Sequence, residues 1–373
     1  LVPDALAALQ RLATWHLSRL DCRVVGVTGS MGKTTTREAI ASVLARRFDV
    51  LRSEKNYNNE IGLPLTLLKL GPEHERAVLE MGMYSLGDIS ALCRIAPPHV
   101  GVLTNVSYVH LERLGSVDRI AEAKSELIRA LPADGWAVLN ADDERVLAMR
   151  RHTQARIITY GLGQGADVWA SDVEPVGLQG LRLRLRSGEE DVAVFCPLPG
   201  RHNAYTCLAA AAAGLAEGMA LGEVAEGLQA MEQRPRLIIL PGPRGSTIID
   251  DTYNANPLAV TAALELLGSL PGRKVAVLGD MFELGPYEEE GHRQVGRKAA
   301  AMVDELVVVG PRARWIGEEA RAQGLETVSF VASKQDVNLS LGPGDYVLVK
   351  GSRGMRMEEI VARLQQQRGE AVA

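Results

Sequence analysis

The sequence has none of the features that mark a membrane-spanning, disulfide-linked or nucleic-acid-binding protein. No apolar run is long enough to span a bilayer, and no charged-then-apolar leader opens the chain. The four cysteines are scattered without a CxxC pair, which favours free buried thiols over disulfides or zinc. The net charge of -5 offers no basic footprint for nucleic acid. We therefore expect a cytoplasmic protein with neither membrane nor nucleic-acid partners.

Aromatic residues are also scarce, at 4% of the chain, although apolar residues as a whole reach 46%. Much of the apolar content is Ala, Leu and Val, which fits helices packed on parallel strands. The length of 373 residues suggests two or three domains of about 150 residues each. Internal repeats and low-complexity tracts are absent from the sequence.

The most informative stretch is VVGVTGSMGKTTT, at residues 24–36. It reads as a short apolar strand, a glycine-rich turn and a helix that begins near Lys33. Such a turn lets backbone N–H groups approach a phosphate, and the helix N-terminus adds its positive dipole. Lys33 would reach the terminal phosphates, and the hydroxyl of Thr34 would ligate magnesium. The residues predicted to bind ATP in this loop are Gly29, Ser30, Met31, Gly32, Lys33, Thr34 and Thr35.

The glycine spacing of this loop departs from the usual P-loop pattern. Val27 stands where the first glycine is expected, and glycines occur at Gly26 and Gly29 instead. The alternative is a glycine-rich turn with a chance Lys-Thr pair. The coincidence of strand, turn, lysine, hydroxyl and helix favours nucleotide binding.

Two further polar side chains follow the next predicted strands. Glu80 lies near the end of strand 77–82, and His110 lies just past strand 99–106. Functional residues in open α/β sheets collect at the carboxyl ends of strands, so Glu80 is placed as a magnesium ligand or a water-orienting acid. Each side chain alone could be solvated or structural, but candidate ligands after three successive strands point to a site. Lys124, on a predicted helix at 120–128, reads by default as a solvated surface lysine.

An amide-rich loop at 53–64 contains Asn58 and Asn59. It is either a solvated turn or a segment that recognises polar groups of a ligand.

Near residue 156 the strand–helix alternation gives way to short strands, predicted as an antiparallel patch at 156–160, 167–173, 180–186 and 191–196. After a linker at 233–235 the alternation restarts, with strands predicted at 236–240, 246–251, 274–279, 305–309, 327–331 and 345–349.

These patterns predict an α/β protein with three parts. Residues 1–20 form a lead-in helix, and residues 21–234 form a central ATP-binding domain with a mostly parallel sheet. Residues 235–373 form a Rossmann-like domain that has no second phosphate loop. Its strand-end loops, at 249–257, 278–285 and 350–354, are expected to supply a second substrate site.

The ordered motifs TGSMGKTTT, NYNNEIGLP, LEMGM, TNVSYVHLERLGS, AKSELI and GRHNAYTCLAA resemble the Mur ligase family over essentially the whole chain. Three more motifs, DDTYNANP, LGDMFELG and VKGSRGM, look like the branch that adds D-alanyl-D-alanine to UDP-N-acetylmuramoyl-tripeptide. The resemblance implies an ATP-dependent, ADP-forming ligase that makes an amide bond through an acyl phosphate, in peptidoglycan precursor synthesis. One alternative is a related ligase that joins another carboxylate and amine. Another is an ATP-binding scaffold without ligase chemistry.

The resemblance also implies roles for particular residues. Catalysis would involve Lys33, Glu80, His110 and Lys124. Two magnesium ions are implied: Lys33 and Thr34 handle the ATP phosphates and the first ion, Glu80 is a magnesium ligand, and His110 contributes to a second site. Lys124 matches a lysine that carbon dioxide converts to a carbamate, which could bind magnesium directly. Asn203 matches an amide near the adenine, and Arg236 and Asp251 match groups that close on the nucleotide. Substrate binding is assigned to Asn58, Asn59, Tyr253, Asn254, Asn256, Lys350 and Ser352.

Two departures from the family pattern affect these expectations. Thr206 stands where the family usually has an asparagine, which changes one adenine contact. The family's N-terminal domain, which holds the UDP-sugar, has no counterpart in the sequence. We expect either that it was removed upstream of Leu1 or that the acceptor is smaller. The expected partners are small molecules, a UDP-sugar peptide or other carboxylate and D-Ala-D-Ala or another amine, and we expect a monomer.

Overall fold

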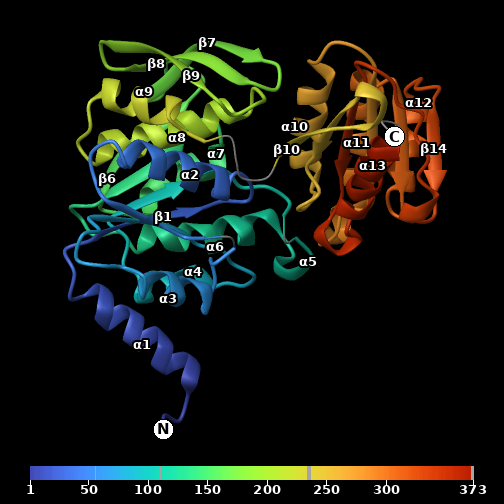
Figure 1. Cartoon of the computed structure of the whole chain (residues 1–373). Coiled ribbons are helices and arrows are strands. Elements are labelled where there is room, and N and C mark those ends of the chain that lie inside the picture. The colour runs from blue at the N-terminus through green and yellow to red at the C-terminus, as the bar shows by residue number, and fades with distance from the viewer. Residues whose placement is uncertain (55, 110, 233–236, 371–373) are drawn as a thin grey trace. The chain divides into compact units, whose positions relative to one another are not determined.

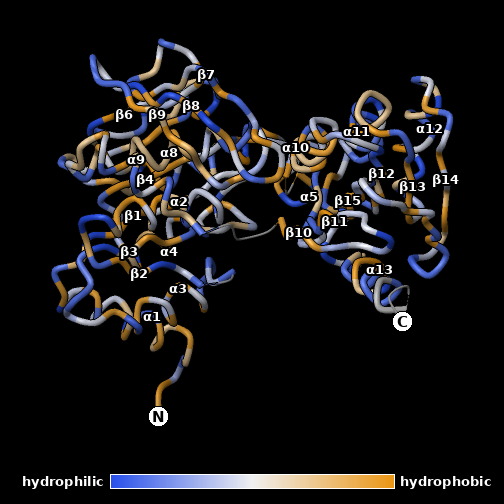
Figure 2. The backbone as a smooth tube through the Cα atoms, turned by 45° about the horizontal axis from the view of Figure 1, so that its top comes forward, coloured by the Kyte–Doolittle hydropathy of each residue, from blue (hydrophilic) through white to orange (hydrophobic). Residues whose placement is uncertain are grey.

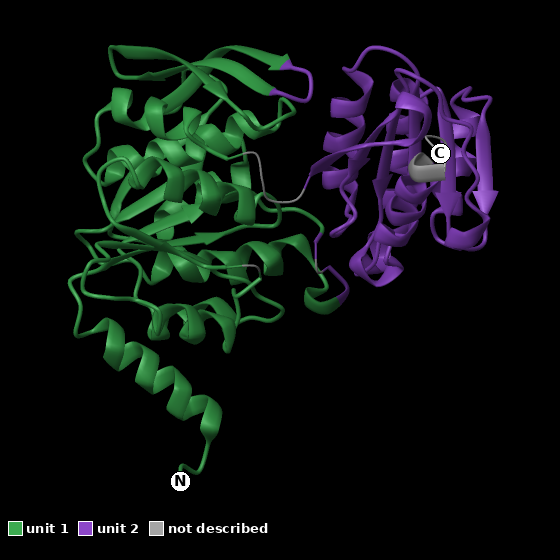
Figure 3. Ribbon diagram, viewed as in Figure 1, with its two compact units in different colours: residues 1–108, 113–175, 180–233 green, residues 109–112, 176–179, 234–373 purple. Residues whose placement is uncertain are grey.

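The structure, a computed structural model, describes residues 1–54, 56–109, 111–232 and 237–370 (Figure 1). These residues form two compact α/β units, unit 1 from most of residues 1–233 and unit 2 from most of residues 234–373 (Figure 3). The short stretch 176–179 groups with unit 2, as do the described residues of 109–112. The expected linker at 233–235 lies outside the described residues. Within the described residues, no helix has both the length and the apolar character needed to cross a membrane.

The elements before residue 233 alternate strands and helices up to β6. They are α1 Ala5–Leu17, β1 Arg23–Thr28, α2 Lys33–Leu44, β2 Val50–Arg52, α3 Gly62–Leu67, β3 Arg76–Glu80, α4 Asp88–Ile95, β4 Val100–Leu103, α5 Leu111–Leu114, α6 Val117–Arg129, β5 Trp136–Asn140, α7 Glu144–Ala148, a 3₁₀ turn Met149–His152, β6 Arg156–Gly161, β7 Val168–Val176, β8 Gly180–Ser187, β9 Glu190–Cys196, α8 Asn203–Ala216 and α9 Leu221–Gln229.

The strands of unit 1 form one sheet in the order β2-β3-β1-β4-β5-β6-β7-β8-β9. The pairings from β2 through β6 are parallel. These central strands are almost continuously apolar and buried because helices cover both faces of the sheet. The hydropathy colouring of Figure 2 shows the same hydrophobic centre around β1 and β3.

The predicted antiparallel patch is only partly antiparallel. β6 pairs in parallel with both β5 and β7, whereas β8 and β9 pair antiparallel. The first of the four short segments therefore continues the parallel sheet. Strict alternation along 181–186 identified a half-exposed strand correctly, but alternation carries no information on the direction of a strand's neighbours.

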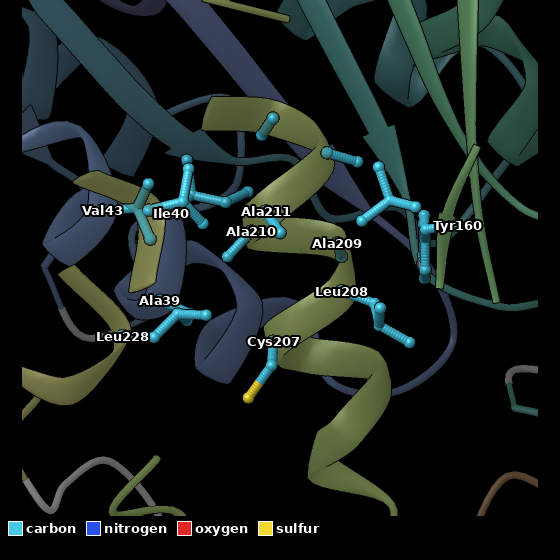
Figure 4. Close-up of a cluster of buried hydrophobic side chains, with 14 of the residues drawn as sticks. Ala39, Ile40, Val43, Tyr160, Cys207, Leu208, Ala209, Ala210, Ala211 and Leu228 are labelled. Atoms are coloured by element: carbon cyan, nitrogen blue, oxygen red, sulfur yellow. The ribbon is translucent and has the colours of Figure 1, made fainter. Parts of the chain in front are cut away.

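One face of the unit 1 sheet is covered by α2, α8 and α9, and α4 and α6 lie on the other (Figure 1). The alanine-rich helix α8 packs closely because alanine side chains let its backbone approach its neighbours. Figure 4 shows Ala209, Ala210 and Ala211 between Ile40 of α2 and Tyr160 of β6. All five of these side chains are at most 1% exposed. The close packing of α2 fixes the helix that carries Lys33 and Thr34.

Helix α1 packs against α3 and α4 of unit 1 and buries Ala13 and Leu17. Thr14 Oγ1 donates to Ile95 O (3.1 Å), and His16 Nε2 lies 2.8 Å from Leu70 O. Leu12 and Trp15 on the same helix are 50% and 60% exposed.

Unit 2 contains β10 Ile238–Pro241, β11 Thr247–Asp250, α10 Pro257–Gly268, β12 Lys274–Gly279, α11 Glu288–Met302, β13 Glu305–Val309, α12 Arg314–Ala322, β14 Val328–Val331, β15 Tyr346–Lys350, α13 Glu358–Glu370 and 3₁₀ turns at Pro243–Gly245, Gly285–Tyr287, Lys334–Asp336 and Arg353–Met355. All six strands lie within two residues of their predicted bounds. The sheet order is β10-β11-β15-β12-β13-β14, and all pairings except β10 with β11 are parallel. One apolar cluster joins α10, α11 and α12 to the sheet, and a second joins α13.

Candidate functional site

Three adjacent strand ends meet at one edge of the unit 1 sheet. β1 lies between β3 and β4, with Val27 opposite Glu80 and Thr28 opposite Leu103. The glycine-rich loop follows β1, Glu80 is the last residue of β3, and residues 104–107 follow β4. Strand β4 ends at Leu103, before its predicted end at 106, and Thr104 and Asn105 beyond it bond through their side chains to the glycine-rich loop. The topology therefore brings the ends of β1, β3 and β4 together, as expected for neighbouring parallel strands.

Glu80 is the centre of a buried polar network. Its side chain is 1% exposed, and its Oε2 accepts a hydrogen bond from Thr34 Oγ1 (2.8 Å). Its Oε1 accepts from Asn58 Nδ2 (2.9 Å), which connects the amide-rich loop to Glu80. The backbone N–H of Glu80 donates to Ser53 Oγ (3.1 Å). Thr34, Asn58 and Glu80, predicted separately, thus form one hydrogen-bonded group.

Arg37 also belongs to this network, although the sequence reasoning missed it. It lies three residues after Thr34 on α2, and its side chain is 4% exposed. Its Nη1 is 3.6 Å from Glu80 Oε2, and its Nε donates to Glu38 Oε1 (3.2 Å). A buried arginine needs acidic partners. The available sequence signal was that Arg37 lies three residues after Thr34 on α2, which places both side chains on the same face of the helix.

The glycine-rich loop directs two of its N–H groups into the protein. Ser30 N–H donates to Asn105 O (2.9 Å), and Met31 N–H donates to Asn105 Oδ1 (2.9 Å). The first hydrogen bond inside α2 runs from Thr36 N–H to Gly32 O (2.8 Å). The N–H groups that precede it, from Gly32 to Thr35, form the first turn of the helix, where anions bind. Ser30 and Met31, predicted to bind ATP, could do so only through other atoms.

Lys33 and Lys124 place two amines near this loop. Lys33 Nζ donates to Gly29 O (2.8 Å) and Ser30 O (3.4 Å). The reading of Lys124 as a solvated surface lysine is wrong, because its side chain on α6 is only 2% exposed. Burial, together with the charge of Lys33, holds the pKa of Lys124 well below its usual value. A lowered pKa favours the unprotonated amine, which is the nucleophilic form.

Two predicted residues, His110 and Arg236, lie outside the described residues. Among the residues that the structure describes, no three His, Cys, Asp or Glu side chains gather as a metal site. Magnesium does not require such a cage, because it is commonly held by one or two carboxylates with phosphate oxygens and water. The carboxylate of Glu80 beside the hydroxyl of Thr34 fits that donor set.

Asn203 opens α8 and is held at both ends of its amide. Its Nδ2 donates to Pro199 O (2.7 Å), and its Oδ1 accepts from Thr206 Oγ1 (3.3 Å). Thr206, which replaces an amide of the family pattern, therefore orients Asn203. Asn59 has a local role, since its Oδ1 accepts from Gly62 N–H (2.8 Å) at the start of α3. The adenine and substrate contacts of these residues stay predictions.

In unit 2, two of the predicted substrate residues, Lys350 and Ser352, connect loops that follow different strands. Lys350 is 3% exposed, and its Nζ donates to Asp251 Oδ2 (2.6 Å) and Asn254 O (2.9 Å). Ser352 Oγ accepts from Phe282 N–H (2.9 Å), which ties the loop after β15 to the loop after β12. These strand ends therefore form one connected group.

Asn256 and Tyr253 lie on the loop before α10. Asn256 Oδ1 accepts from Ala259 N–H (2.9 Å) and caps α10. Tyr253 is 39% exposed, and the guanidinium carbon of Arg353 is 5.9 Å from the centre of its ring. Of the predicted substrate residues in unit 2, Tyr253 is the one with a large exposed side chain.

The strand, glycine-rich loop and helix of residues 23–44 give unit 1 the architecture of a P-loop nucleotide-binding protein. Family models agree with both units. The Mur ligase middle domain matches residues 27–214, and the Mur ligase glutamate ligase domain matches residues 235–353.

Whole-chain relatives extend this likeness. The UDP-N-acetylmuramoyl-tripeptide–D-alanyl-D-alanine ligase of Bacillus subtilis is 40% identical over 98% of this chain and 80% of that protein. The Escherichia coli enzyme of the same name is 36% identical over 98% of this chain and 82% of that protein. The chain belongs to the Mur ligase family.

Solved structures show the same similarity. A crystal structure of MurF from Acinetobacter baumannii has a TM-score of 0.90 and 31% identity, covering 98% of this chain and 82% of that one. MurF ligase from Thermotoga maritima in complex with ADP has a TM-score of 0.87 and 30% identity, covering 99% and 86%.

Proposed function

We propose that this chain is an ATP-dependent, ADP-forming ligase that joins D-alanyl-D-alanine to UDP-N-acetylmuramoyl-tripeptide in peptidoglycan precursor synthesis. The observation that carries the proposal is 40% identity to a ligase of that name over 98% of the chain. The solved relative that binds ADP supports the nucleotide. The buried group of Thr34, Asn58 and Glu80 beside the glycine-rich loop gives the proposal a chemical site.

The reaction has two steps. A carboxylate oxygen of the tripeptide attacks the γ-phosphorus of ATP, the bond to the β–γ bridging oxygen breaks, and an acyl phosphate and ADP result. The amine of D-alanyl-D-alanine then attacks the acyl carbon, loses a proton and expels inorganic phosphate. Lys33 and the N-terminus of α2 offset the negative charge that develops on the transferred group. Positioning and charge neutralisation supply most of the rate enhancement.

Thr34 and Glu80 would hold a magnesium ion, which neutralises phosphate charge when bound. In this structure Thr34 Oγ1 donates a hydrogen bond to Glu80 Oε2 (2.8 Å), so the two candidate ligand oxygens are already adjacent. Asn58 and Arg37 keep the carboxylate in place from its other sides. A second ion at His110 is part of the proposal.

Lys124 is proposed to become a carbamate. Its neutral amine would attack the carbon of carbon dioxide, form an N–C bond and release one proton, which converts a cation site into an anionic oxygen ligand. The lowered pKa of Lys124 supports this step, because only the unprotonated amine reacts. The carbamate would place negative charge near Lys33.

The proposed substrates and ATP belong to the cytoplasm, and we propose that the enzyme acts there as a monomer on small molecules. The test is phosphate release by the 373-residue chain with Mg-ATP, D-alanyl-D-alanine and UDP-N-acetylmuramoyl-tripeptide, with each organic substrate omitted in turn. Mass spectrometry identifies the product. A new amide only when both are present supports the proposal. An amide formed from other acids and amines favours a related ligase, and nucleotide binding without any product favours a scaffold.

A further inference from the structure

The segment after β4, residues 104–107, holds the peptide groups of the glycine-rich loop by both edges. Asn105 Oδ1 accepts from Met31 N–H (2.9 Å), and Asn105 Nδ2 donates to Met31 O (3.2 Å). Thr104 Oγ1 donates to the same Met31 O (2.6 Å). Ser30 N–H donates to Asn105 O (2.9 Å). We call residues 104–107 the brace.

The brace makes a second connection at Ser30. Ser30 Oγ accepts from Ser107 N–H (2.9 Å) and donates to Ser107 O (3.4 Å). Because Ser30 is 6% exposed and Ser107 is 6% exposed, these bonds are shielded from water.

The brace is itself held from the strands behind it. Asn140 Nδ2 donates to Thr104 O (2.9 Å), and Tyr160 Oη donates to Leu103 O (3.0 Å). Asp143 Oδ2 accepts from Val106 N–H (2.8 Å). These partners follow β5 or lie on β5 and β6, so the sheet transmits its rigidity to the glycine-rich loop.

Gly29 is required by the brace. An ideal Cβ at Gly29 would lie 1.9 Å from Thr104 Oγ1 and 3.2 Å from Asn105 N, and its φ is +149°. No side chain fits there while Thr104 stays in place. Packing against the brace therefore explains the glycine at position 29.

We propose that Thr104 and Asn105 are positioning residues for the nucleotide. They hold the Met31 peptide so that the N–H groups of Ser30 and Met31 face the protein and the first turn of α2 faces the phosphates. This inference rests on the proposed function, because the ligand is ATP. Without the brace, the nucleotide itself would have to order the glycine-rich loop when it binds. The free-energy cost of that ordering would weaken the measured affinity for the nucleotide.

The test uses near-isosteric variants of the whole chain. Thr104→Val removes the hydroxyl, and Thr104→Ser keeps it. Asn105→Leu removes both side-chain bonds to Met31. Thr66→Val is the matched control, since Thr66 is 2% exposed and its Oγ1 donates to Gly62 O (2.9 Å) in α3. Calorimetry measures the Kd of Mg-ADP, melting without ligand reports stability, and steady-state assays separate the KM for ATP from kcat.

We expect Thr104→Val to weaken Mg-ADP binding about tenfold and Asn105→Leu on the order of 100-fold, at roughly one decade per lost bond. Thr104→Ser stays near the wild type. Thr66→Val should lower the melting temperature but leave the Kd for Mg-ADP unchanged. The KM for ATP rises more than kcat falls.

An unchanged Kd in Thr104→Val, with a melting temperature lowered as in Thr66→Val, would overturn the inference. It would show that the bonds are structural only. If Asn105→Leu does not fold, Thr104→Val still decides the question. A wild type that binds Mg-ADP but forms no amide sinks the proposed function alone, whereas a wild type that binds no nucleotide sinks both.

Discussion

Removing the charge of Glu80 is the sharpest perturbation of the proposed site. Glu80→Gln keeps the shape of the side chain but replaces one acceptor oxygen with a donor. The amide cannot accept from Thr34 and Asn58 on two oxygens as the carboxylate does, at 2.8 and 2.9 Å. Hydrogen bonds to a charged acceptor contribute about 1.5–3 kcal/mol each, so one lost bond alone is substantial.

The change also removes the buried counter-charge of Arg37. At 3.6 Å the gross attraction between Arg37 and Glu80 is about 4–5 kcal/mol at an effective dielectric constant of about 20. Arg37 keeps Glu38 as a partner, so the net loss is smaller, and we expect a stability decrease of about 2 kcal/mol. For catalysis we expect kcat/KM to fall on the order of 10³-fold, the scale of one lost electrostatic group.

Glu38→Gln is the matched control, because Glu38 pairs with the same arginine but lies outside the Thr34–Asn58–Glu80 group. It also pairs with Arg52 (2.8 Å) and is 21% exposed. It should lower stability by a similar amount and leave kcat/KM within about threefold of wild type. The assay is phosphate release with all three substrates, at several magnesium concentrations. Activity of Glu80→Gln within tenfold of wild type, or an equal loss in Glu38→Gln, would refute the assignment.

Three further predictions concern basic side chains that are buried or lie beside the glycine-rich loop. Lys33→Ala should lower turnover by about 3–4 kcal/mol of transition-state stabilisation, and near-normal phosphate release would defeat the P-loop assignment. Carbon dioxide removal should lower activity and bicarbonate should restore it in the wild type but not in Lys124→Met, with one added CO2 visible by mass; indifference to carbon dioxide contradicts the carbamate. Burial lowers the pKa of His292, so as pH falls below 6.5 the unfolded chain binds a proton that the folded chain does not. Unit 2 should then lose up to about 1.4 kcal/mol per pH unit, and melting of His292→Gln should show a flatter dependence.

Sequence patterns predicted the parts of the fold that depend on local chemistry. The strand, turn and helix around Lys33 and the six strands of unit 2 follow from apolar runs and glycine breaks. Adjacent parallel strands then explain why Thr34 and Glu80, 46 residues apart, meet at 2.8 Å. This step needed only the rule that ligands gather at strand ends.

The rest of the site depends on neighbours that periodicity does not reveal. Lys124 was predicted to be exposed because helical spacing identifies the apolar face of a helix but does not show which other elements pack over its polar residues. The pairing of Lys350 with Asp251 joins residues 99 apart, and both had been assigned to ligands rather than to each other. The role of Arg37 could be predicted only by knowing that Glu80 lies against the first turns of α2. Tertiary packing decides each of these cases.

The brace shows the same limit in the loop that the sequence described best. The glycines of TGSMGKT read as a phosphate cradle, yet Gly29 is set by Thr104 and two loop N–H groups are used by Asn105. Those partners lie about 75 residues further along the chain, directly after β4, the strand that pairs with β1. The proposed nucleotide site thus depends on three paired strands rather than on one motif. Substitutions at residues 104–107 should therefore resemble P-loop substitutions in their effect on nucleotide affinity, although no phosphate contact is assigned to these residues.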